Sequence, residues 1–240
     1  MRLQDIYEHL NLVSPFELQE SWDNSGLIVG DPNQEITKVI VTIDLDEELI
    51  DKLEEGVLVI THHPLIFGGL KQLRFNHYPA VHLRKLIQKN IANIAMHTNF
   101  DQTHLNRFVA EDVLGFKITD NDGFVAFMDI DTTLEKLALH VKRVFGLRQL
   151  KIVAAKRDIK RLALTTGSGA SLMRGIEADC FLTGDIKYHD AMEAQSIELS
   201  MIDIGHYESE RFFGDILAKH LKNLALEVII AQSKNPFTYL

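Results

Sequence analysis

The sequence predicts an α/β fold made of two intertwined, topologically similar halves, each with a mixed sheet. Short β-branched runs alternate with segments of helical periodicity along all 240 residues. The strand runs lack a polar alternation, which is typical of strands buried on both faces of a parallel or mixed sheet. The order of strands and helices also recurs in the second half. A turn signal at Asn121-Asp122-Gly123 places the boundary between halves 1–120 and 121–240.

The first half is expected to open with a helix, because apolar residues recur at helical spacing from Leu3 to Leu10, before Pro15. The predicted strands are 38–43, 57–61 and 91–96, with a helix at 44–53 between the first two. Pro79 is expected to open the next helix, and Asp101 or Thr103 to cap the one that Gly115 ends.

The second half repeats this alternation. A strand at 124–130 precedes a helix for which Thr132 and Glu135 form a capping box. Further strands, with helices between several of them, are predicted at 151–155, 161–165, 179–183, 199–204 and 227–231.

Composition excludes several classes of protein. With 46% hydrophobic and 25% charged residues, the chain is typical of a soluble globular protein, and a net charge of −9 makes nucleic acid an unlikely partner. The single cysteine, Cys180, permits no internal disulfide and is expected to be a buried small hydrophobe rather than a catalytic thiol. Residues 1–12 do not resemble a signal peptide, and no apolar run approaches the ~20 residues of a membrane span. We therefore expect a cytoplasmic protein without membrane contact.

Polar residues gather at the carboxyl ends of the predicted strands, where open α/β sheets bind ligands. His97 is followed four residues later by Asp101, and His206 is followed at the same spacing by Glu210. The middle strands end in Thr61-His62-His63 and Thr183-Gly184-Asp185, the latter with His189 shortly after. The repeat predicts that both sets face a shared cleft.

These residue types favour a metal site. His206 and Glu210 share one face if that segment is helical, whereas adjacent His62 and His63 on an extended backbone would point to opposite sides and suit two ions better than one. Three imidazoles with two carboxylates are typical of Zn²⁺, Fe²⁺, Mn²⁺ or Ni²⁺, and two such ions would activate water for hydrolysis.

Each signal has a structural alternative. A lone histidine is usually a surface or hydrogen-bonded core residue, and a His-x-x-x-Glu pair occurs on many helix surfaces. His97, His104 and His189 are candidates for substrate contact or for supporting the metal ligands, with structural roles as the alternative. Gly167-Ser168-Gly169 could cradle a phosphate or form a tight turn.

The sequence resembles the NIF-three-like family, often named GTP cyclohydrolase I type 2 homologues. The motifs that carry the resemblance are Glu20 to Gly26 (ESWDNSG), Thr61 to Leu65 (THHPL), His97 to Asp101 (HTNFD), Thr183 to Asp185 (TGD) and Gly205 to Glu210 (GHYxxE). It implies two similar α/β halves, a toroidal homohexamer, and dinuclear metal sites whose ligands are His62, His63, Asp101, His206 and Glu210. The segment 22–26 would be the loop beside that site, and the extra domain of some longer members is absent here.

The cyclohydrolase name implies attack of an activated water on C8 of a guanine ring and release of formate, with a base such as His97 or His189 moving protons. The first hypothesis is therefore a metal-dependent hydrolase acting on a nucleotide, possibly GTP, or on a related heterocycle. The alternative is a non-catalytic metal-binding ring with a regulatory or protein-interaction role.

Overall fold

The computed structural model describes residues 1–238 and divides the chain into two compact units. Unit 1 contains residues 1–100 and the chain from residue 212 onward, and unit 2 contains residues 101–211. The chain thus leaves unit 1, forms unit 2 and returns. The boundary expected at 120/121 falls inside β5 (Asp120–Asp122), a strand of unit 2.

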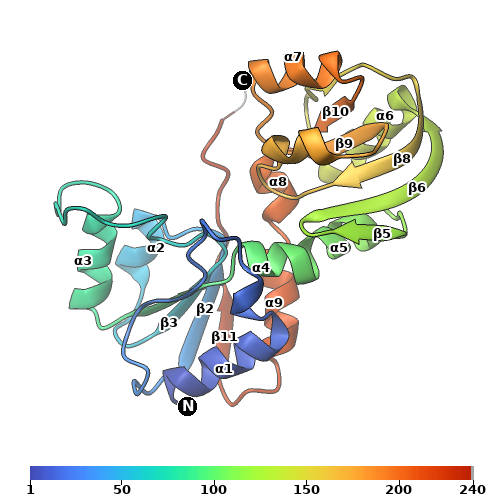
Figure 1. Cartoon of the computed structure of the whole chain (residues 1–240). Coiled ribbons are helices and arrows are strands. Elements are labelled where there is room, and N and C mark those ends of the chain that lie inside the picture. Colours follow the sequence, from blue (N-terminus) through green and yellow to red (C-terminus); the bar gives the residue numbers. More distant parts are fainter. Residues whose placement is uncertain (239–240) are drawn as a thin grey trace. The chain divides into compact units, whose positions relative to one another are not determined.

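Unit 1 is built on a mixed sheet with the strand order β1-β4-β3-β2-β11 (Figure 1). β11, β2, β3 and β4 are parallel to their neighbours, whereas β1 pairs antiparallel with β4. The strands are β1 (Gly26–Val29), β2 (Lys38–Thr42), β3 (Leu58–Thr61), β4 (Ala92–Ala95) and β11 (Glu227–Ile230).

Helices cover this sheet because its central strands are apolar on both faces. Every residue of β3 is buried, which confirms the prediction of a strand covered on both faces, and every residue of β4 is buried too, the polar Asn93 included. One core cluster joins Ile40 and Val59 of the sheet to Ile50 and Leu86 of the helices. The principal helices of unit 1 are α1 (Leu3–Val13), α2 (Glu47–Lys52), α3 (Ala80–Gln88) and α9 (Phe213–Leu221), with a short 3₁₀ turn at Phe16–Leu18.

Unit 2 has a second mixed sheet, with the order β5-β6-β8-β9-β10-β7. β8, β9 and β10 are parallel, while β6 and β7 pair antiparallel with β8 and β10. Besides β5, the strands are β6 (Val125–Thr133), β7 (Ile152–Val153), β8 (Asp158–Leu164), β9 (Cys180–Thr183) and β10 (Ser200–Asp203). The helical segments are α6 (Leu134–Phe145), the 3₁₀ segment η4 (Ala170–Gly175), α7 (Tyr188–Ser196) and α8 (His206–Glu210).

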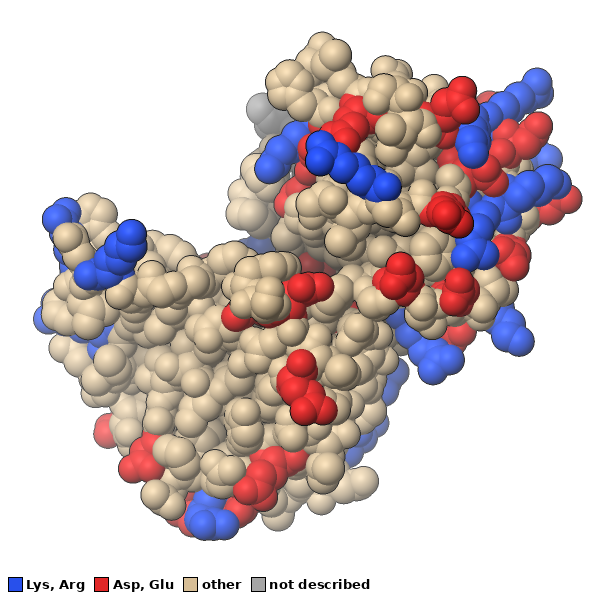
Figure 2. Space-filling model, viewed as in Figure 1, with Lys and Arg blue, Asp and Glu red and all other residues tan. Residues whose placement is uncertain are grey.

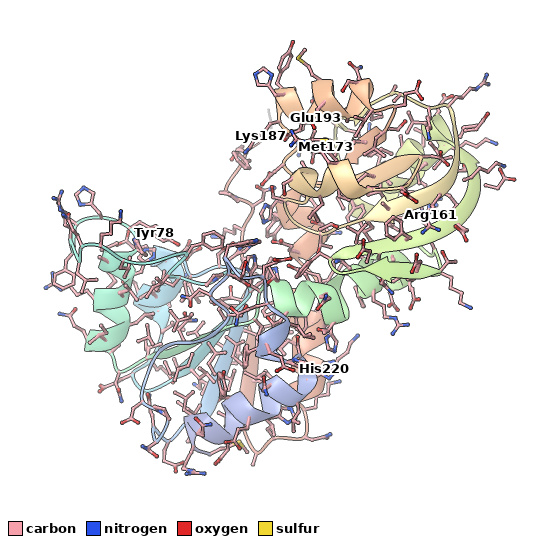
Figure 3. All side chains as sticks on the ribbon, viewed as in Figure 1. Tyr78, Arg161, Met173, Lys187, Glu193 and His220 are labelled. Carbon is pink, nitrogen blue, oxygen red and sulfur yellow. The ribbon has the colours of Figure 1, made fainter. Side chains whose placement is uncertain are left out.

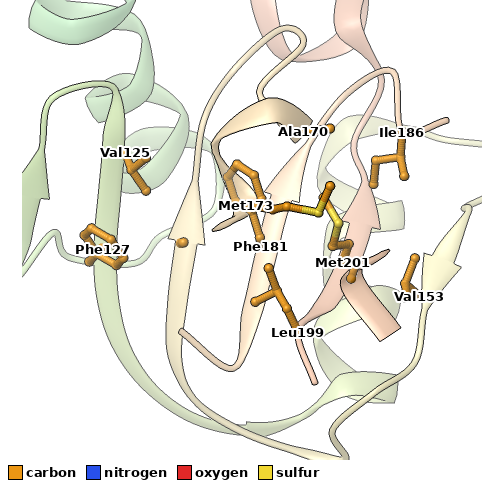
Figure 4. Close-up of a cluster of buried hydrophobic side chains, with 11 residues drawn as sticks. Val125, Phe127, Val153, Ala170, Met173, Phe181, Ile186, Leu199 and Met201 are labelled. Atoms are coloured by element: carbon orange, nitrogen blue, oxygen red, sulfur yellow. The ribbon is translucent and has the colours of Figure 1, made fainter. Parts of the chain in front are cut away.

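The core of unit 2 packs apolar side chains of this sheet against η4 and α7. Phe181 and Met201 of the central strands meet Met173 of η4 (Figure 4). At the solvent side, the guanidinium of Arg161, labelled in Figure 3, lies 4.6 Å from the ring centroid of Phe127. Cys180 is fully buried in β9, as expected, and burial raises the pKa of its thiol.

The two units share a topology. In unit 1 the order is α1-β1-β2-α2-β3-α3-β4, and in unit 2 it is α6-β7-β8-η4-β9-α7-β10. In both, three successive strands are parallel and adjacent, and the short strand before them pairs antiparallel with the third. The mixed α/β architecture predicted from the internal repeat is therefore confirmed within each unit.

Three local predictions were wrong. The helical stretch after β4 already begins at Thr98, so neither Asp101 nor Thr103 caps it; it runs through α4 (Thr98–Phe100), a π-helical turn (Asp101–Leu105), α5 (Asn106–Phe108) and a second π-helical turn (Val109–Val113). The cap of α6 is Thr133, whose hydroxyl accepts from the Lys136 N–H, one residue after the predicted Thr132. The segment between β8 and β9 is 3₁₀ rather than α-helical.

Charged side chains of both signs lie on the face shown in Figure 2. In unit 2 many Lys and Arg side chains stand beside Asp and Glu, whereas the Lys and Arg at the upper left of unit 1 have no acidic side chain next to them. Among the described helices, none combines the length and the apolar character required to cross a bilayer.

Candidate metal centre

Three histidines of unit 1 meet at the carboxyl ends of two neighbouring strands. Thr61, the last residue of β3, pairs with Ala95, the last residue of β4. The chain continues into His62 and His63 after β3, and reaches His97 after β4. One ligand nitrogen from each of these histidines lies within 4.8 Å of the others. The parallel register thus explains why residues 34 or more positions apart form one cluster.

The expectation that His62 and His63 point to opposite sides was wrong. Their ring centroids are 5.0 Å apart. The alternation rule holds only along a strand, and β3 ends at Thr61. The backbone N–H groups of His62 and His63 both donate to the carbonyl of Ile43, so the chain bends here and brings both imidazoles to one side.

Each of the three imidazoles uses Nδ1 for a hydrogen bond inside unit 1. His62 Nδ1 donates to the Met96 carbonyl at 2.9 Å, and His63 Nδ1 donates to Asp44 Oδ1 at 2.8 Å. His97 Nδ1 donates to Asp23 at 2.8 Å. A carbonyl or carboxylate oxygen can only accept, so Nδ1 of each ring carries a proton, and Nε2 is the nitrogen that a metal would take. Such a partner is the usual accompaniment of a metal-binding histidine.

Asp23 fixes the loop before β1 to the end of β4. Its side chain has no exposed surface. Oδ2 accepts from the Thr98 hydroxyl and N–H at 2.5 and 3.1 Å and from Ser25 Oγ at 3.0 Å, and Oδ1 accepts from the Asn24 N–H as well as from His97. Burial alone would raise the pKa of Asp23, but the hydrogen bonds from His97 and Thr98 outweigh it and hold the pKa far below its ordinary value of 3.8.

Because of these bonds, Asp23→Asn is expected to destabilise metal-free unit 1 by about 2 kcal/mol at neutral pH. A carboxyl group whose pKa is lowered by folding stabilises the folded state at pH values above its pKa in the unfolded chain. The stability difference between wild type and Asp23→Asn should therefore be fully present well above pH 3.8 and shrink as the pH falls below it. Urea unfolding followed by fluorescence of Trp22, the single tryptophan, reports on unit 1. The Asp5→Asn change, which removes a solvent-exposed ion pair with Arg2, should leave the stability close to that of the wild type. Equal losses for both variants would contradict a special role for Asp23.

Unit 2 places His206 and Glu210 at the two ends of α8. The predicted helical spacing is confirmed: His206 Nε2 lies 3.1 Å from Glu210 Oε2. His206 Nδ1 donates to Asp185 Oδ2 at 2.7 Å, the same arrangement as in the three histidines of unit 1. Asp185 has a φ of +55°, a left-handed conformation uncommon outside glycine, which marks a constrained position.

Two glycines make room for this pair. At Gly184 a Cβ would lie 2.6 Å from the His206 backbone nitrogen, so the chain can pass α8 only without a side chain. At Gly167, with φ +65°, a Cβ would overlap Glu210 Oε1. The Thr-Gly-Asp motif and the segment after β8 are thus shaped around α8.

The phosphate interpretation of Gly167-Ser168-Gly169 is not supported. The Gly167 N–H donates to Ser209 Oγ at 3.0 Å, and the Gly169 N–H donates to Thr183 Oγ1 at 2.7 Å. These groups hold a tight turn, and the helix that follows is a single short 3₁₀ segment. The alternative of a strand-to-helix turn therefore holds.

Asp101 lies at the first residue of unit 2 and is buried. Its Oδ1 accepts from Thr166 Oγ1 at 3.2 Å, and the Thr166 N–H donates to Asn106 Oδ1 at 2.8 Å. A buried carboxylate held beside a strand end is a suitable metal ligand.

The donor set and its supports fit a divalent metal: histidines, an aspartate and a glutamate that could hold an ion, with Nε2 as the ligand nitrogen.

Comparison with known proteins identifies the family. A family model described as Duf34/NIF3 (NGG1p interacting factor 3) matches residues 1–236. The chain belongs to the Duf34/NIF3 family. The resemblance drawn from the sequence motifs is confirmed.

Relatives of this Duf34/NIF3 chain match it over nearly their full length. A Campylobacter jejuni protein named GTP cyclohydrolase 1 type 2 homolog is 50% identical over 100% of both chains. A Helicobacter pylori protein named GTP cyclohydrolase 1 type 2 is 45% identical over 98% of this chain and 97% of the relative. Among solved structures, a hypothetical protein of Staphylococcus aureus has a TM-score of 0.85 at 28% identity, covering 100% and 99% of the two chains. Reduced HcgD from Methanocaldococcus jannaschii has a TM-score of 0.82 at 26% identity, covering 96% and 97%.

The remaining candidate residues of the Duf34/NIF3 chain occupy different settings. His97 belongs to the histidine cluster of unit 1, whereas His189 is exposed on α7 with its ring 5.3 Å from that of Tyr188. His104 is half-buried, and its Nδ1 is 2.8 Å from the neighbouring Thr103 hydroxyl. Of these three histidines, His97 alone lies beside His62 and His63 in unit 1.

Sequence reasoning named Asp185 among the polar residues at strand ends, but it did not assign it to His206, and it missed Asp44 as the partner of His63. Asp44 lies two residues after the end of β2, so the carboxyl-end rule that selected the histidines would also have selected it. Asp23 lies in a loop before a strand, and no periodicity or spacing connects it with His97.

Proposed function

We propose that this chain binds two divalent metal ions through His62, His63, Asp101, His206 and Glu210, and that it hydrolyses a nucleotide or a related heterocycle. The hydrogen-bonded Nδ1 atoms carry this proposal. All three proposed imidazole ligands use Nδ1 to donate to a carbonyl or carboxylate oxygen. The metal-binding atom of each ring would then be Nε2, and that of His206 already lies 3.1 Å from the carboxylate of the second proposed ligand in unit 2, Glu210.

Divalent ions held by these residues would supply an activated water and polarise a substrate oxygen. The protein's own contribution is orientation and proton transfer. Asp23 holds the proton of His97 at Nδ1, which leaves Nε2 able to accept or return a proton beside His62 and His63. His189 is the second candidate for a proton-transferring group, and its exposure on α7 permits contact with a bound substrate.

GTP is the first substrate to test, because the close relatives bear the name GTP cyclohydrolase 1 type 2. We expect metal-loaded protein to release formate from GTP, as hydrolysis at C8 of the guanine ring requires. His97→Ala should slow this release by about a hundredfold with little change in metal content. Tag-free protein and the exposed-histidine variant His77→Ala are the controls. If variants of the proposed ligands bind no metal and still release formate, the release does not depend on the metal. That result would refute a metal-dependent hydrolase and favour a non-catalytic metal-binding ring.

The same proposal includes a homohexameric ring in the cytoplasm, as the family resemblance implies. Light scattering coupled to gel filtration measures the mass directly, against 27.3 kDa for one chain. A single species of one-chain mass across a wide range of concentration would contradict the ring.

A further inference from the structure

Two exposed aromatic rings stand beside the histidine cluster of unit 1. Trp22 and Phe67 are 54% and 63% exposed, although large aromatic side chains are normally covered. Their ring centroids are 5.6 Å apart with a tilt of 48°. Both rings also lie edge-on to His97, at 6.1 and 6.0 Å. Trp22 and Phe67, here called the aromatic platform, therefore adjoin an imidazole of the candidate metal centre.

The backbone on both sides of the aromatic platform is anchored. Asp23, directly after Trp22, is held by Thr98 and His97. Asn24 Nδ2 donates to the carbonyl of Ile66, directly before Phe67, at 2.8 Å. The two loops are thus tied to each other and to the end of β4. Two rings that stand on an anchored backbone and are open to solvent suit a ligand, because little order of the backbone remains to be imposed on binding.

The loop that carries Phe67 is positively charged, which favours a ligand with negatively charged groups. Residues 66–78, which end at Tyr78 just before α3 (Figure 3), include Lys71 and Arg74 and contain no Asp or Glu, in a chain of net charge −9. Both cationic residues are exposed. Aromatic faces stack on any planar base, and Lys and Arg bind phosphate.

We infer that the aromatic platform is the stacking subsite for a planar nitrogen heterocycle with a phosphate chain, and that Lys71 and Arg74 bind the phosphates. This inference rests on the proposed function and names the residues that would select its substrate class. It assigns Trp22 and Phe67 to binding and positioning, and assigns them no part in proton transfer.

Trp22 is the single tryptophan of the chain, so its fluorescence reports on the aromatic platform without any assay of activity. Metal-free and metal-loaded protein are titrated with GTP, guanosine and inorganic triphosphate, with correction for light absorbed by the nucleotide. We expect saturable quenching by GTP and guanosine in both metal states, and little response to triphosphate. Phe67→Ala should raise the apparent dissociation constant for GTP about tenfold. Phe237→Ala, which removes another aromatic ring that is 68% exposed, should leave it unchanged.

A second series of variants distinguishes loss of the Trp22 ring from disturbance of the fold. Trp22→Ala is measured by calorimetry and should lose affinity to a similar extent, while Trp22→Phe should recover most of it. Absence of quenching by GTP and guanosine, or equal affinities in wild type and Phe67→Ala, would overturn the inference. The inference would also be overturned if the fluorescence of Trp22 changed with the protein concentration and not with added nucleotide, because a second copy of the chain would then cover Trp22. Metal content measured on the same samples tests the proposed metal ligands independently.

Discussion

The double variant His63→Ala, Glu210→Ala is expected to lower the metal content from about two ions per chain to about none. It removes one proposed ligand from each unit. His63 contributes an imidazole whose Nδ1 is fixed by Asp44, and Glu210 contributes a carboxylate with 2% exposed surface. Elemental analysis of protein purified without an affinity tag or chelator measures the effect. Any hydrolase activity should fall by at least about a hundredfold in parallel.

The control for this variant must remove the same residue types away from the candidate ligands. His77→Ala, Glu177→Ala meets this need: His77 is exposed with Nδ1 near Asn76, and Glu177 is exposed and is not one of the candidate ligands. Because truncation of buried Glu210 could disturb unit 2, the isosteric Glu210→Gln is measured beside it. A metal content equal to that of the wild type in both the double variant and Glu210→Gln would refute the ligand assignment.

The sequence predicted the strands and their polar ends for a physical reason. Runs such as 57–61 are too short and too β-branched for a helix, and their unbroken apolar character fits burial on both faces. Once β3 and β4 are parallel neighbours, His62 and His97 must lie at the same edge. The candidate ligands were therefore accessible from pattern alone, and the family motifs added an ordered set of matching positions.

What could not be predicted depends on backbone geometry beyond the strands. The bend that brings His62 and His63 to one side follows from hydrogen bonds to Ile43 that no periodicity encodes. β1 is short and contains a bulge at Leu27 to Val29, so its pattern is weak. The role of Asp23 depends on a contact with His97, 74 residues away in the chain.

Gly167→Ala is expected to weaken metal binding through Glu210, although no ligand is itself substituted. A Cβ at this position would overlap Glu210 Oε1 and lie 3.6 Å from His206 Nε2, so the carboxylate has to move. Displacing an oriented ligand costs about 10- to 100-fold in metal affinity. The alanine also has to adopt a φ near +65°, which costs about 1 kcal/mol of stability. Competition with a chelating dye measures the affinity, and urea unfolding measures the stability.

Gly146→Ala separates these two effects. Gly146 ends α6 in the same unit with a φ of +70°, and a Cβ there would meet nothing within 4 Å. This variant should therefore lose about 1 kcal/mol of stability from the backbone alone and keep the metal affinity of the wild type. If both variants lost metal affinity equally, the effect would come from general loosening of unit 2. A loss confined to Gly167→Ala would show that the turn after β8 lacks a side chain because the Glu210 carboxylate occupies that space.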